Sequence, residues 1–242
     1  MLKKIIFIIL FFSIFNIQNF KYTFSSEFRQ NNFNQAKKFA IKISKKFPKS
    51  FYCGCTIDWN AKKGIPDLKS CNYKIRKNRI RANRIEWDHI VPAWEFGHNK
   101  KCWKKGGRKK CSSNSIFKKM ESDLHNLQPA IGEINGDRSN FSFYEWKKNH
   151  KKNFYGSCHV LIDFKNKKIE PPNSKKGIIS RTYLYMSYRY KIKIPKKQMI
   201  LFKKWNSKYP VNKWECQRDN LIYKIQGNHN QYVHNKCIKI PK

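Results

Sequence analysis

Hydrophobic residues recur at helical spacing in four segments of the chain, with lysines and other polar residues between them. In the first segment, phenylalanine, alanine and isoleucine residues repeat from Phe28 to Phe47, and Pro48 ends the repeat. Side chains spaced three and four residues apart lie on one face of a helix. The pattern therefore predicts an amphipathic helix that ends before Pro48. Three further helices are predicted, at 178–190, 196–205 and 214–225, the last closed by Gly227.

Two other segments have the composition of β-strands. Positions 84–91 hold mostly residues that favour an extended backbone, and Pro92 argues against their continuing as a central strand. Positions 159–164 are also strand-like. No internal repeat or long flexible linker separates the elements. We therefore expect one mixed, helix-rich α+β domain.

Between these strands, the stretch 120–140 predicts a short extended piece followed by a helix. The helix is expected to begin near Pro129, because proline suits the first helical turn. Ile131 and Ile134 are spaced so that both would face the core.

The N-terminus has the pattern of a secretory signal. A positively charged start is followed by an apolar run at 5–15 that is too short to span a bilayer comfortably. No clean small-x-small cleavage site follows, so an uncleaved anchor remains an alternative to a signal peptide at 1–25. No later apolar run approaches the ~20 residues of a membrane span. We expect a domain over 26–242 with no stable membrane association once the signal is removed.

Eight cysteines lie beyond this signal. An even count in a secreted chain predicts four disulfides, although many connectivities are possible. The pair expected first is Cys102 with Cys111, around the loop Gly106-Gly107. Positions 53–71 are expected to form a disulfide-tied loop broken by glycine and proline. Structural zinc is a minor alternative, because the spacings include one C-x-C and no C-x-x-C.

The chain carries 53 lysines and arginines against 15 acidic residues, a formal net charge of +38. A genome rich in A and T would enrich lysine without any function, but it would not explain the scarcity of acidic residues. The imbalance favours a polyanionic partner, either nucleic acid or an anionic membrane surface.

Candidate chemistry centres on Asp88 and His89, which follow each other in the strand-like stretch 84–91. A neutral histidine can accept a proton from water at neutral pH. A carboxylate and an amide oxygen can hold Mg²⁺, which keeps several of its waters. Arg108 offers planar donors for a phosphate. These residue types together suit phosphodiester hydrolysis, although an isolated Asp-His pair is more often structural.

Several motifs, in one order, resemble the periplasmic and secreted endonuclease I family of bacteria. The likeness runs from about Phe51 to the C-terminus. The longer matching segments are 84–98, 102–111, 120–129, 132–140 and 181–186, and the shorter ones are 52–55, 209–211, 215–216, 218–219 and 226–230. The resemblance implies a ββα-metal (His-Me finger) site. In such a site a β-hairpin presents the general base and the next helix presents a metal-binding asparagine.

Carried over to this chain, the resemblance makes His89 the general base and Arg108 the phosphate-binding arginine. Asp88 stands where the family more usually has glutamate as a direct Mg²⁺ ligand. Its side chain is one methylene shorter, and a bridging water could make up the distance. Asn135 is the favoured second ligand because it should lie on the helix. Asn126 is the rival, but it is expected to brace the hairpin through hydrogen bonds.

The expected activity is that of a periplasmic or secreted, Mg²⁺-dependent, monomeric endonuclease with little sequence preference. Its expected substrate is double-stranded DNA, with RNA as a second candidate. Two alternatives remain: a non-catalytic cationic protein that binds nucleic acid or membranes, and a ribonuclease that uses His89 without a metal.

Other residues are expected to be structural. Trp87 and Trp94 are expected in the core, and Glu86 and Glu121 are expected either to orient groups of the site or to pair with lysines. His125 is expected to form hydrogen bonds within the finger. The remaining histidines show no ligand spacing and are expected to be structural or exposed: His98, His150, His159, His229 and His234.

Overall fold

The computed structural model describes residues 32–147 and 153–238. The predicted signal peptide at 1–25 lies outside the described residues, as do Phe28 and His150. None of the helices in the described ranges is both long enough and apolar enough to cross a membrane.

The described chain mixes helices with short strands, which confirms the α+β expectation. The helices are α1 Phe33–Lys46, α2 Arg79–Ala82, α3 Ala93–Gly97, α4 Lys101–Cys111, α5 Ser115–Glu121, α6 Gly132–Arg138, α7 Asn173–Tyr190, α8 Lys196–Lys208, α9 Lys213–Gln226 and α10 Gln231–Cys237, with short 3-10 turns η2 Lys69–Cys71 and η3 Leu124–Asn126. The strands are β1 Ile57–Asn60, β2 Lys63–Pro66, β3 Ile85–His89, β4 Leu127–Ile131, β5 Ser142–Phe143, β6 Leu161–Asp163 and β7 Lys168–Glu170.

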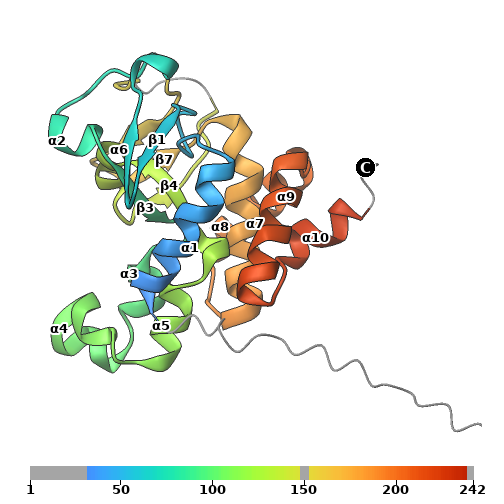
Figure 1. Cartoon of the computed structure of the whole chain (residues 1–242). Coiled ribbons are helices and arrows are strands. Elements are labelled where there is room, and N and C mark those ends of the chain that lie inside the picture. The colour runs from blue at the N-terminus through green and yellow to red at the C-terminus, as the bar shows by residue number, and fades with distance from the viewer. Residues whose placement is uncertain (1–31, 148–152, 239–242) are drawn as a thin grey trace, which may run out of the picture.

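These strands form three small sheets, with the orders β1-β2, β3-β4 and β5-β7-β6. Figure 1 shows the long helices α7, α8 and α9 gathered on one side of the molecule and the strands on the other. Helix α1 runs between the two, and α3, α4 and α5 form a separate group at one end. The site described below lies on the strand side.

The predicted helices are present, with shifted ends. Helix α1 begins at Phe33, where the side chain of Asn32 accepts a hydrogen bond from the Gln35 amide. Helix α7 begins before the predicted 178, at Asn173 directly after two prolines. Helix α9 is closed as predicted, because Gly227 adopts a left-handed conformation with φ 78°.

The expectation that a helix begins near Pro129 is wrong. Pro129 lies in the middle of β4, opposite Trp87 on β3, and α6 begins at Gly132. Strand β4 pairs with β3 alone among the described strands, so its other edge does not need an amide hydrogen at position 129. The carbonyl of Pro129 instead accepts a hydrogen bond of 2.7 Å from the Phe51 amide.

The expected loop at 53–71 also contains regular structure. Strands β1 and β2 form an antiparallel hairpin there, with Trp59 opposite Gly64. A side chain at position 64 would collide with Trp59 and with Ile85 on β3. The glycine that looked like a breaker therefore allows the hairpin to pack closely against β3.

Two hydrophobic clusters hold these elements together. The larger one extends from the strands to α7 and α8 and includes Ile131 and Ile134, both buried as predicted. The smaller one packs the apolar face of α1 against η3, β4 and α9. It contains Ala36, Ala40, Ile43, Leu124, Leu127 and Ile222.

All eight cysteines lie in the described ranges and are paired, as the even count predicted. The bridges are Cys53–Cys158, Cys55–Cys71, Cys102–Cys111 and Cys216–Cys237. The expected Cys102–Cys111 pair is confirmed, and the chain inside it bends at Gly106 and Gly107. This pairing leaves no cysteine for a zinc site.

The Cys53–Cys158 bridge should be the more stabilising of two that can be compared directly. It joins residues 105 apart, whereas Cys102–Cys111 joins residues 9 apart. Constraint of the unfolded chain grows with loop length, so replacing the long-range pair by serines should lower the free energy of unfolding by roughly 5 kcal/mol, against roughly 3 kcal/mol for the short-range pair. Urea denaturation of both double variants tests the order, and a larger loss for the short loop would contradict it.

Candidate active site

Strands β3 and β4 and helix α6 form one continuous unit. The strands run antiparallel, with Glu86 opposite Ala130 and His89 opposite Leu127, and α6 follows β4 without a linker. The amide of Gly132, the first residue of α6, donates a 2.9 Å hydrogen bond to the Arg84 carbonyl. The chain between the strands, 90–126, carries α3, α4 and α5. The unit is therefore two strands followed by a helix, the order that the resemblance implies.

One cavity of about 300 Å³ opens beside this unit, and all four predicted site residues line it. Asp88 and His89 come from the end of β3, Asn135 from α6 and Arg108 from α4. The structure thus brings together side chains from three elements of the sequence. Asn126 does not line this cavity.

The imidazole of His89 is buried and held in one tautomer. Its Nε2 lies 2.7 Å from the backbone carbonyl oxygen of Glu121. A carbonyl can only accept, so Nε2 carries the proton and Nδ1 keeps its lone pair. Burial, followed by the nearby charge of Arg108, lowers the pKa of His89 to about 3. The ring is therefore neutral at neutral pH and able to accept a proton.

Arg108 is fixed beside this histidine by the same residue, Glu121. Its Nε donates to Oε1 of Glu121 over 2.6 Å, while about 45% of the arginine side chain stays exposed. The guanidinium also lies over the ring of Phe33, 5.0 Å from its centre. Phe33 packs against the ring of His89 as well. Glu121 and Phe33 therefore set the relative positions of the two candidate catalytic groups.

Asp88 points into the protein interior and is hydrogen-bonded through both carboxylate oxygens. Oδ1 accepts from Nη1 of Arg138 over 2.8 Å, and Oδ2 accepts from the hydroxyl of Tyr52 over 2.7 Å. Arg138 is itself buried and also donates to the carbonyls of His89 and Ile90. Burial and the neighbouring Asp88 raise the pKa of Tyr52 well above its ordinary value, so its hydroxyl stays protonated and donates.

Asn135 is oriented by Glu86. Its Nδ2 donates to Oε2 of Glu86 over 2.9 Å, which turns the amide oxygen away from that carboxylate. Burial alone would raise the pKa of Glu86. Hydrogen bonds from Arg81, Asn135 and Arg84 outweigh burial and hold that pKa below its ordinary value. Glu86 thus stays ionised, and the amide oxygen of Asn135 is left free for another partner.

Asn126 has the bracing role that was expected of it. Its Oδ1 accepts from the Val91 amide over 2.7 Å, and its Nδ2 donates to the Val91 carbonyl over 3.0 Å. The side chain is fully buried. Both ends of its amide are therefore occupied by the backbone just after β3.

The oxygen atoms of Asp88 and Asn135 are of the kind that a hard divalent cation prefers. Asp88 already accepts two hydrogen bonds, but each carboxylate oxygen has a second lone pair. The pair fits a Mg²⁺ ion that keeps most of its waters, and a water could bridge to the short aspartate side chain. The donor set does not suit a soft metal, because neither sulfur nor a second imidazole lines the cavity.

A larger cavity of about 360 Å³ lies between α1, β4, α7 and α9. Its lining is mainly apolar and aromatic, and it contains none of the four candidate residues. The smaller cavity is the candidate active site because it holds His89, whose Nδ1 can accept a proton, together with Arg108, Asp88 and Asn135.

The sequence match covers the whole of this arrangement. The profile of the family described as Endonuclease I matches residues 27–237. The chain belongs to the endonuclease I family.

Individual relatives agree with the endonuclease I assignment over most of the chain. A protein named Endonuclease-1 from Buchnera aphidicola subsp. Baizongia pistaciae (strain Bp) is 57% identical over 208 residues, which cover 86% of this chain and 85% of the relative. A periplasmic deoxyribonuclease of Aeromonas hydrophila is 48% identical, with 85% of this chain and 86% of the relative covered. An extracellular deoxyribonuclease of the same species is also 48% identical, with 85% and 89% covered.

Some residues of this endonuclease I chain lie in other surroundings than the sequence predicted. Trp94 is not in the core: it is 45% exposed and stacks on His98. Of the two roles expected for Glu86 and Glu121, the structure shows the first: Glu86 orients Asn135, Glu121 holds Arg108, and the ion pairs of both are with arginines. His125 forms its hydrogen bond outside the strand-strand-helix unit, with the carbonyl of Asn228.

Three residues of the endonuclease I site were missed as members of it: Tyr52, Arg138 and Phe33. Tyr52 and Arg138 lie inside matching motifs, which was the available signal, but nothing in their spacing connects them with Asp88. Phe33 precedes the motifs that carry the resemblance, and its only signal there is its place in the pattern of an amphipathic helix.

Proposed function

We propose that this protein is a Mg²⁺-dependent endonuclease that hydrolyses phosphodiester bonds of double-stranded DNA with low sequence specificity, and that RNA is a second substrate. The observation that carries the proposal is the single cavity lined by His89, Arg108, Asp88 and Asn135. The protein is periplasmic or secreted, like the relatives named periplasmic and extracellular deoxyribonuclease. We expect a monomer that keeps no stable membrane association once a signal peptide at 1–25 has been removed.

We further propose that β3, β4 and α6 form a ββα-metal (His-Me finger) unit. The order of the three elements supports this, as do the positions of the base on the first strand and the asparagine on the helix. In the described structure the two strands are joined by the long segment 90–126, which carries Arg108. The arginine thus comes from the connection between the strands.

In the proposed reaction Nδ1 of His89 accepts a proton from a water molecule, and the oxygen of that water attacks phosphorus in line with the leaving 3′-oxygen. Arg108 donates hydrogen bonds to the phosphoryl oxygens, where negative charge accumulates. Mg²⁺ held by Asp88 and Asn135 would supply stabilisation of charge on the leaving oxygen. Cleavage in this direction leaves 5′-phosphate and 3′-hydroxyl ends.

Digestion of supercoiled plasmid DNA by the oxidised protein tests the proposal. Nicked and then linear plasmid should accumulate with Mg²⁺, and the plasmid should stay intact with a chelator. An intact plasmid in both conditions would favour the cationic binding protein. RNA cleavage that survives chelation would favour the metal-independent ribonuclease.

The two asparagines should respond differently to replacement by alanine. Asn135→Ala removes a proposed ligand from a partly exposed position, so it should raise the Mg²⁺ concentration needed for half-maximal activity with little change in stability. Asn126→Ala leaves the Val91 amide and carbonyl without partners in a buried place and should cost about 1–3 kcal/mol of stability. Magnesium titration and urea denaturation of both variants test this. An Asn126 variant that shifted the Mg²⁺ requirement while keeping its stability would reverse the assignment.

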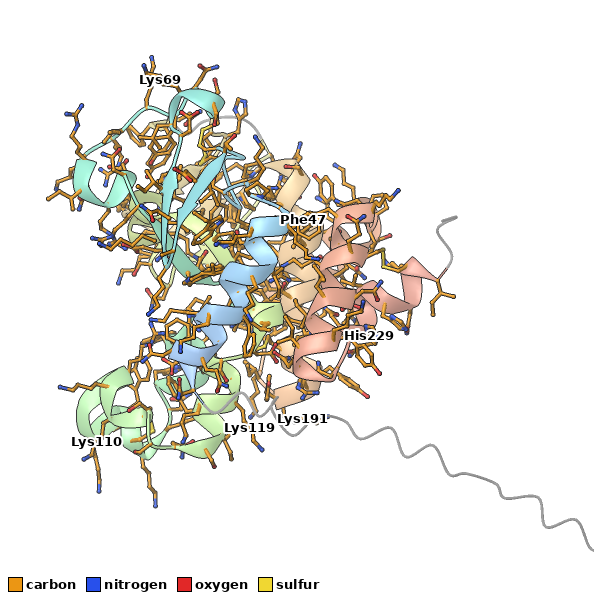
Figure 2. The ribbon with its side chains drawn as sticks, viewed as in Figure 1. Phe47, Lys69, Lys110, Lys119, Lys191 and His229 are labelled. Carbon is orange, nitrogen blue, oxygen red and sulfur yellow. A yellow bond between two sulfur atoms is a disulfide. The ribbon has the colours of Figure 1, made fainter. Side chains whose placement is uncertain are left out.

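The surface supports a polyanionic substrate. Figure 2 shows the exposed side chain of Lys69 at the top of the view and those of Lys110, Lys119 and Lys191 along the bottom. With a net charge of +38 in addition, phosphates can be attracted to both ends of the molecule and need not be guided by one narrow patch. A broadly distributed charge of this kind suits a substrate that is bound without regard to its sequence.

A further inference from the structure

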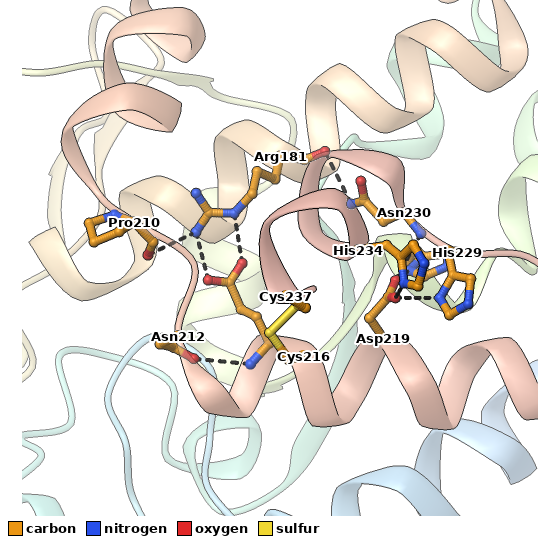
Figure 3. The surroundings of a disulfide bond; sticks show 11 residues. Arg181, Pro210, Asn212, Cys216, Asp219, His229, Asn230, His234 and Cys237 are labelled. Carbon is orange, nitrogen blue, oxygen red and sulfur yellow. Dashed lines mark hydrogen bonds and ion pairs between the residues drawn. A yellow bond between two sulfur atoms is a disulfide. The ribbon is translucent and has the colours of Figure 1, made fainter. Parts of the chain in front are cut away.

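A second group of metal-binding side chains lies outside the catalytic cavity. Asp219 on α9, His229 in the connection to α10 and His234 on α10 face one another, as Figure 3 shows. One ligand atom from each residue lies within 4.8 Å of the other two. Nδ1 of His229 is 2.5 Å from Oδ2 of Asp219, and Nδ1 of His234 is 3.8 Å from the same oxygen. The sequence did not indicate this group, because its members come from separate elements.

The three side chains are already held in place. Oδ1 of Asp219 accepts a 2.8 Å hydrogen bond from the Asn230 amide, which leaves Oδ2 directed at the histidines. The ring of His229 is stacked between those of Tyr223 and His234, with ring centres 4.1 Å and 3.8 Å apart. Asp219 and His229 are therefore restrained before an ion binds, which lowers the entropy cost of binding, while His234 has to tilt from its stacked position.

The group is also accessible from solvent. The side chain of Asp219 is buried, whereas His229 and His234 are 22% and 36% exposed. An ion can reach the histidines, and a water molecule can complete its coordination from the open side.

We propose that Asp219, His229 and His234 bind a divalent transition-metal ion, with Zn²⁺ as the ion that fits best. Two imidazole nitrogens, one carboxylate oxygen and a water form a usual tetrahedral zinc set. Tetrahedral zinc requires its ligand atoms to be roughly 3.3 Å apart. The 2.5 Å and 3.8 Å separations from Oδ2 of Asp219 bracket that value, and the ligand nitrogens of the two histidines lie within 4.8 Å of each other. The two stacked rings must tilt apart so that both nitrogen lone pairs point at one ion.

Binding replaces the hydrogen bond between His229 and Asp219. Nδ1 of His229 must give up its proton to become a ligand, and in the neutral ring that proton then resides on Nε2. Nitrogen donors favour transition metals over Mg²⁺, so this site and the catalytic cavity would select different ions. The single carboxylate also leaves a net positive charge on the loaded site. Zn²⁺ binding should therefore depend on the three ligand atoms and not on a negative electrostatic potential at the site.

The expected consequence is a second connection between α9 and α10. Cys216 on α9 and Cys237 on α10 already form a disulfide between these helices (Figure 3). The metal would join the same helices, starting from Asp219. Metal binding should raise the melting temperature of the oxidised protein. The increase should be larger in a Cys216→Ser/Cys237→Ser variant, where the metal ion would join α9 to α10 in place of the disulfide.

The experiment uses oxidised protein freed of metal by chelation and dialysis, with excess Mg²⁺ present throughout. Isothermal titration with ZnCl₂ should show one saturable site. CoCl₂ should give the visible absorption bands of tetrahedral Co²⁺. His234→Ala and, separately, His229→Ala should weaken Zn²⁺ binding by about 100-fold or more and remove the bands. His159→Ala, the matched control at an exposed histidine outside the group, should bind as the unmodified protein does.

The variants should keep their Mg²⁺-dependent cleavage, because none of the three residues lines the catalytic cavity. This activity shows that each variant is folded when its Zn²⁺ affinity is compared. Absence of saturable Zn²⁺ binding by the unmodified protein would overturn the proposal. A Zn²⁺ affinity equal to that of the unmodified protein in the active His234→Ala and His229→Ala variants would do the same, and the two histidines would then only pack against Asp219.

Discussion

Replacement of His89 by alanine is expected to lower the rate of DNA cleavage by about 10²–10⁴-fold, the usual contribution of a general base. The reason is the arrangement of its ring. Nε2 donates to the Glu121 carbonyl, and Nδ1 is left as an acceptor in the cavity that also holds Arg108. Single-turnover cleavage of plasmid DNA measures the loss without interference from product release.

DNA binding should be unchanged in this variant, because His89 is uncharged at neutral pH and does not attract phosphates. His98→Ala is the matched control: His98 lies on the same stretch of chain but stacks on the exposed Trp94 outside the cavity. It should cleave at the normal rate. A His89→Ala protein that is folded and cuts DNA at more than about a tenth of the normal rate would reject the base assignment.

The lowered pKa of His89 also predicts how the enzyme responds to acid. Activity that depends on the neutral ring should persist below the ordinary histidine pKa of 6.5 and fall as the pH approaches about 3. In the unfolded chain the same ring takes up a proton near pH 6.5. Its contribution to stability is therefore complete above that value and is lost progressively as the pH falls toward 3. Cleavage rates and urea midpoints measured from above pH 6.5 down to about pH 3 test both statements.

Replacement of Arg138 by alanine is expected to lower the free energy of unfolding by about 3–5 kcal/mol. Arg138 is about 1% exposed and donates to Asp88 and to the carbonyls of His89 and Ile90. Without it, the buried carboxylate of Asp88 loses the cation beside it and keeps only the hydrogen bond from Tyr52. Urea denaturation at neutral pH measures the change, and binding of Mg²⁺ beside Asp88 would reduce it.

Arg108→Ala supplies the matched comparison. Its pair with Glu121 lies partly in solvent, so the stability change should be about 1 kcal/mol or less, while cleavage should fall because the phosphate loses a donor. The double variant Asp88→Ala/Arg138→Ala should be less destabilised than the sum of its single variants, because it leaves no unpaired buried charge. If Arg138→Ala were as stable as Arg108→Ala, the buried pair with Asp88 would not be the structural link that we describe.

Much of this protein could be predicted from its sequence, because the features concerned depend on neighbouring residues. Helical spacing before Pro48 and the left-handed Gly227 report local backbone preferences, and α1 and the end of α9 follow from them. The even number of cysteines on an exported chain predicts four disulfides but does not say which cysteines pair. Long motifs in a fixed order led to the family and to the four residues that line one cavity.

These patterns did not predict contacts between residues that are far apart in the sequence. Arg138 lies 50 positions from Asp88, and Tyr52 lies 36 positions from it, so neither periodicity nor spacing connects them. The sequence predicted a helix at Pro129 because proline suits a first helical turn. Proline is tolerated equally well at the unpaired edge of a strand. Only the pairing of β4 with β3 in the folded chain distinguishes the helix from the strand. Local preference is a property of consecutive residues. Charge compensation, tautomer and strand pairing are set by whichever groups the folded chain brings within a few ångströms.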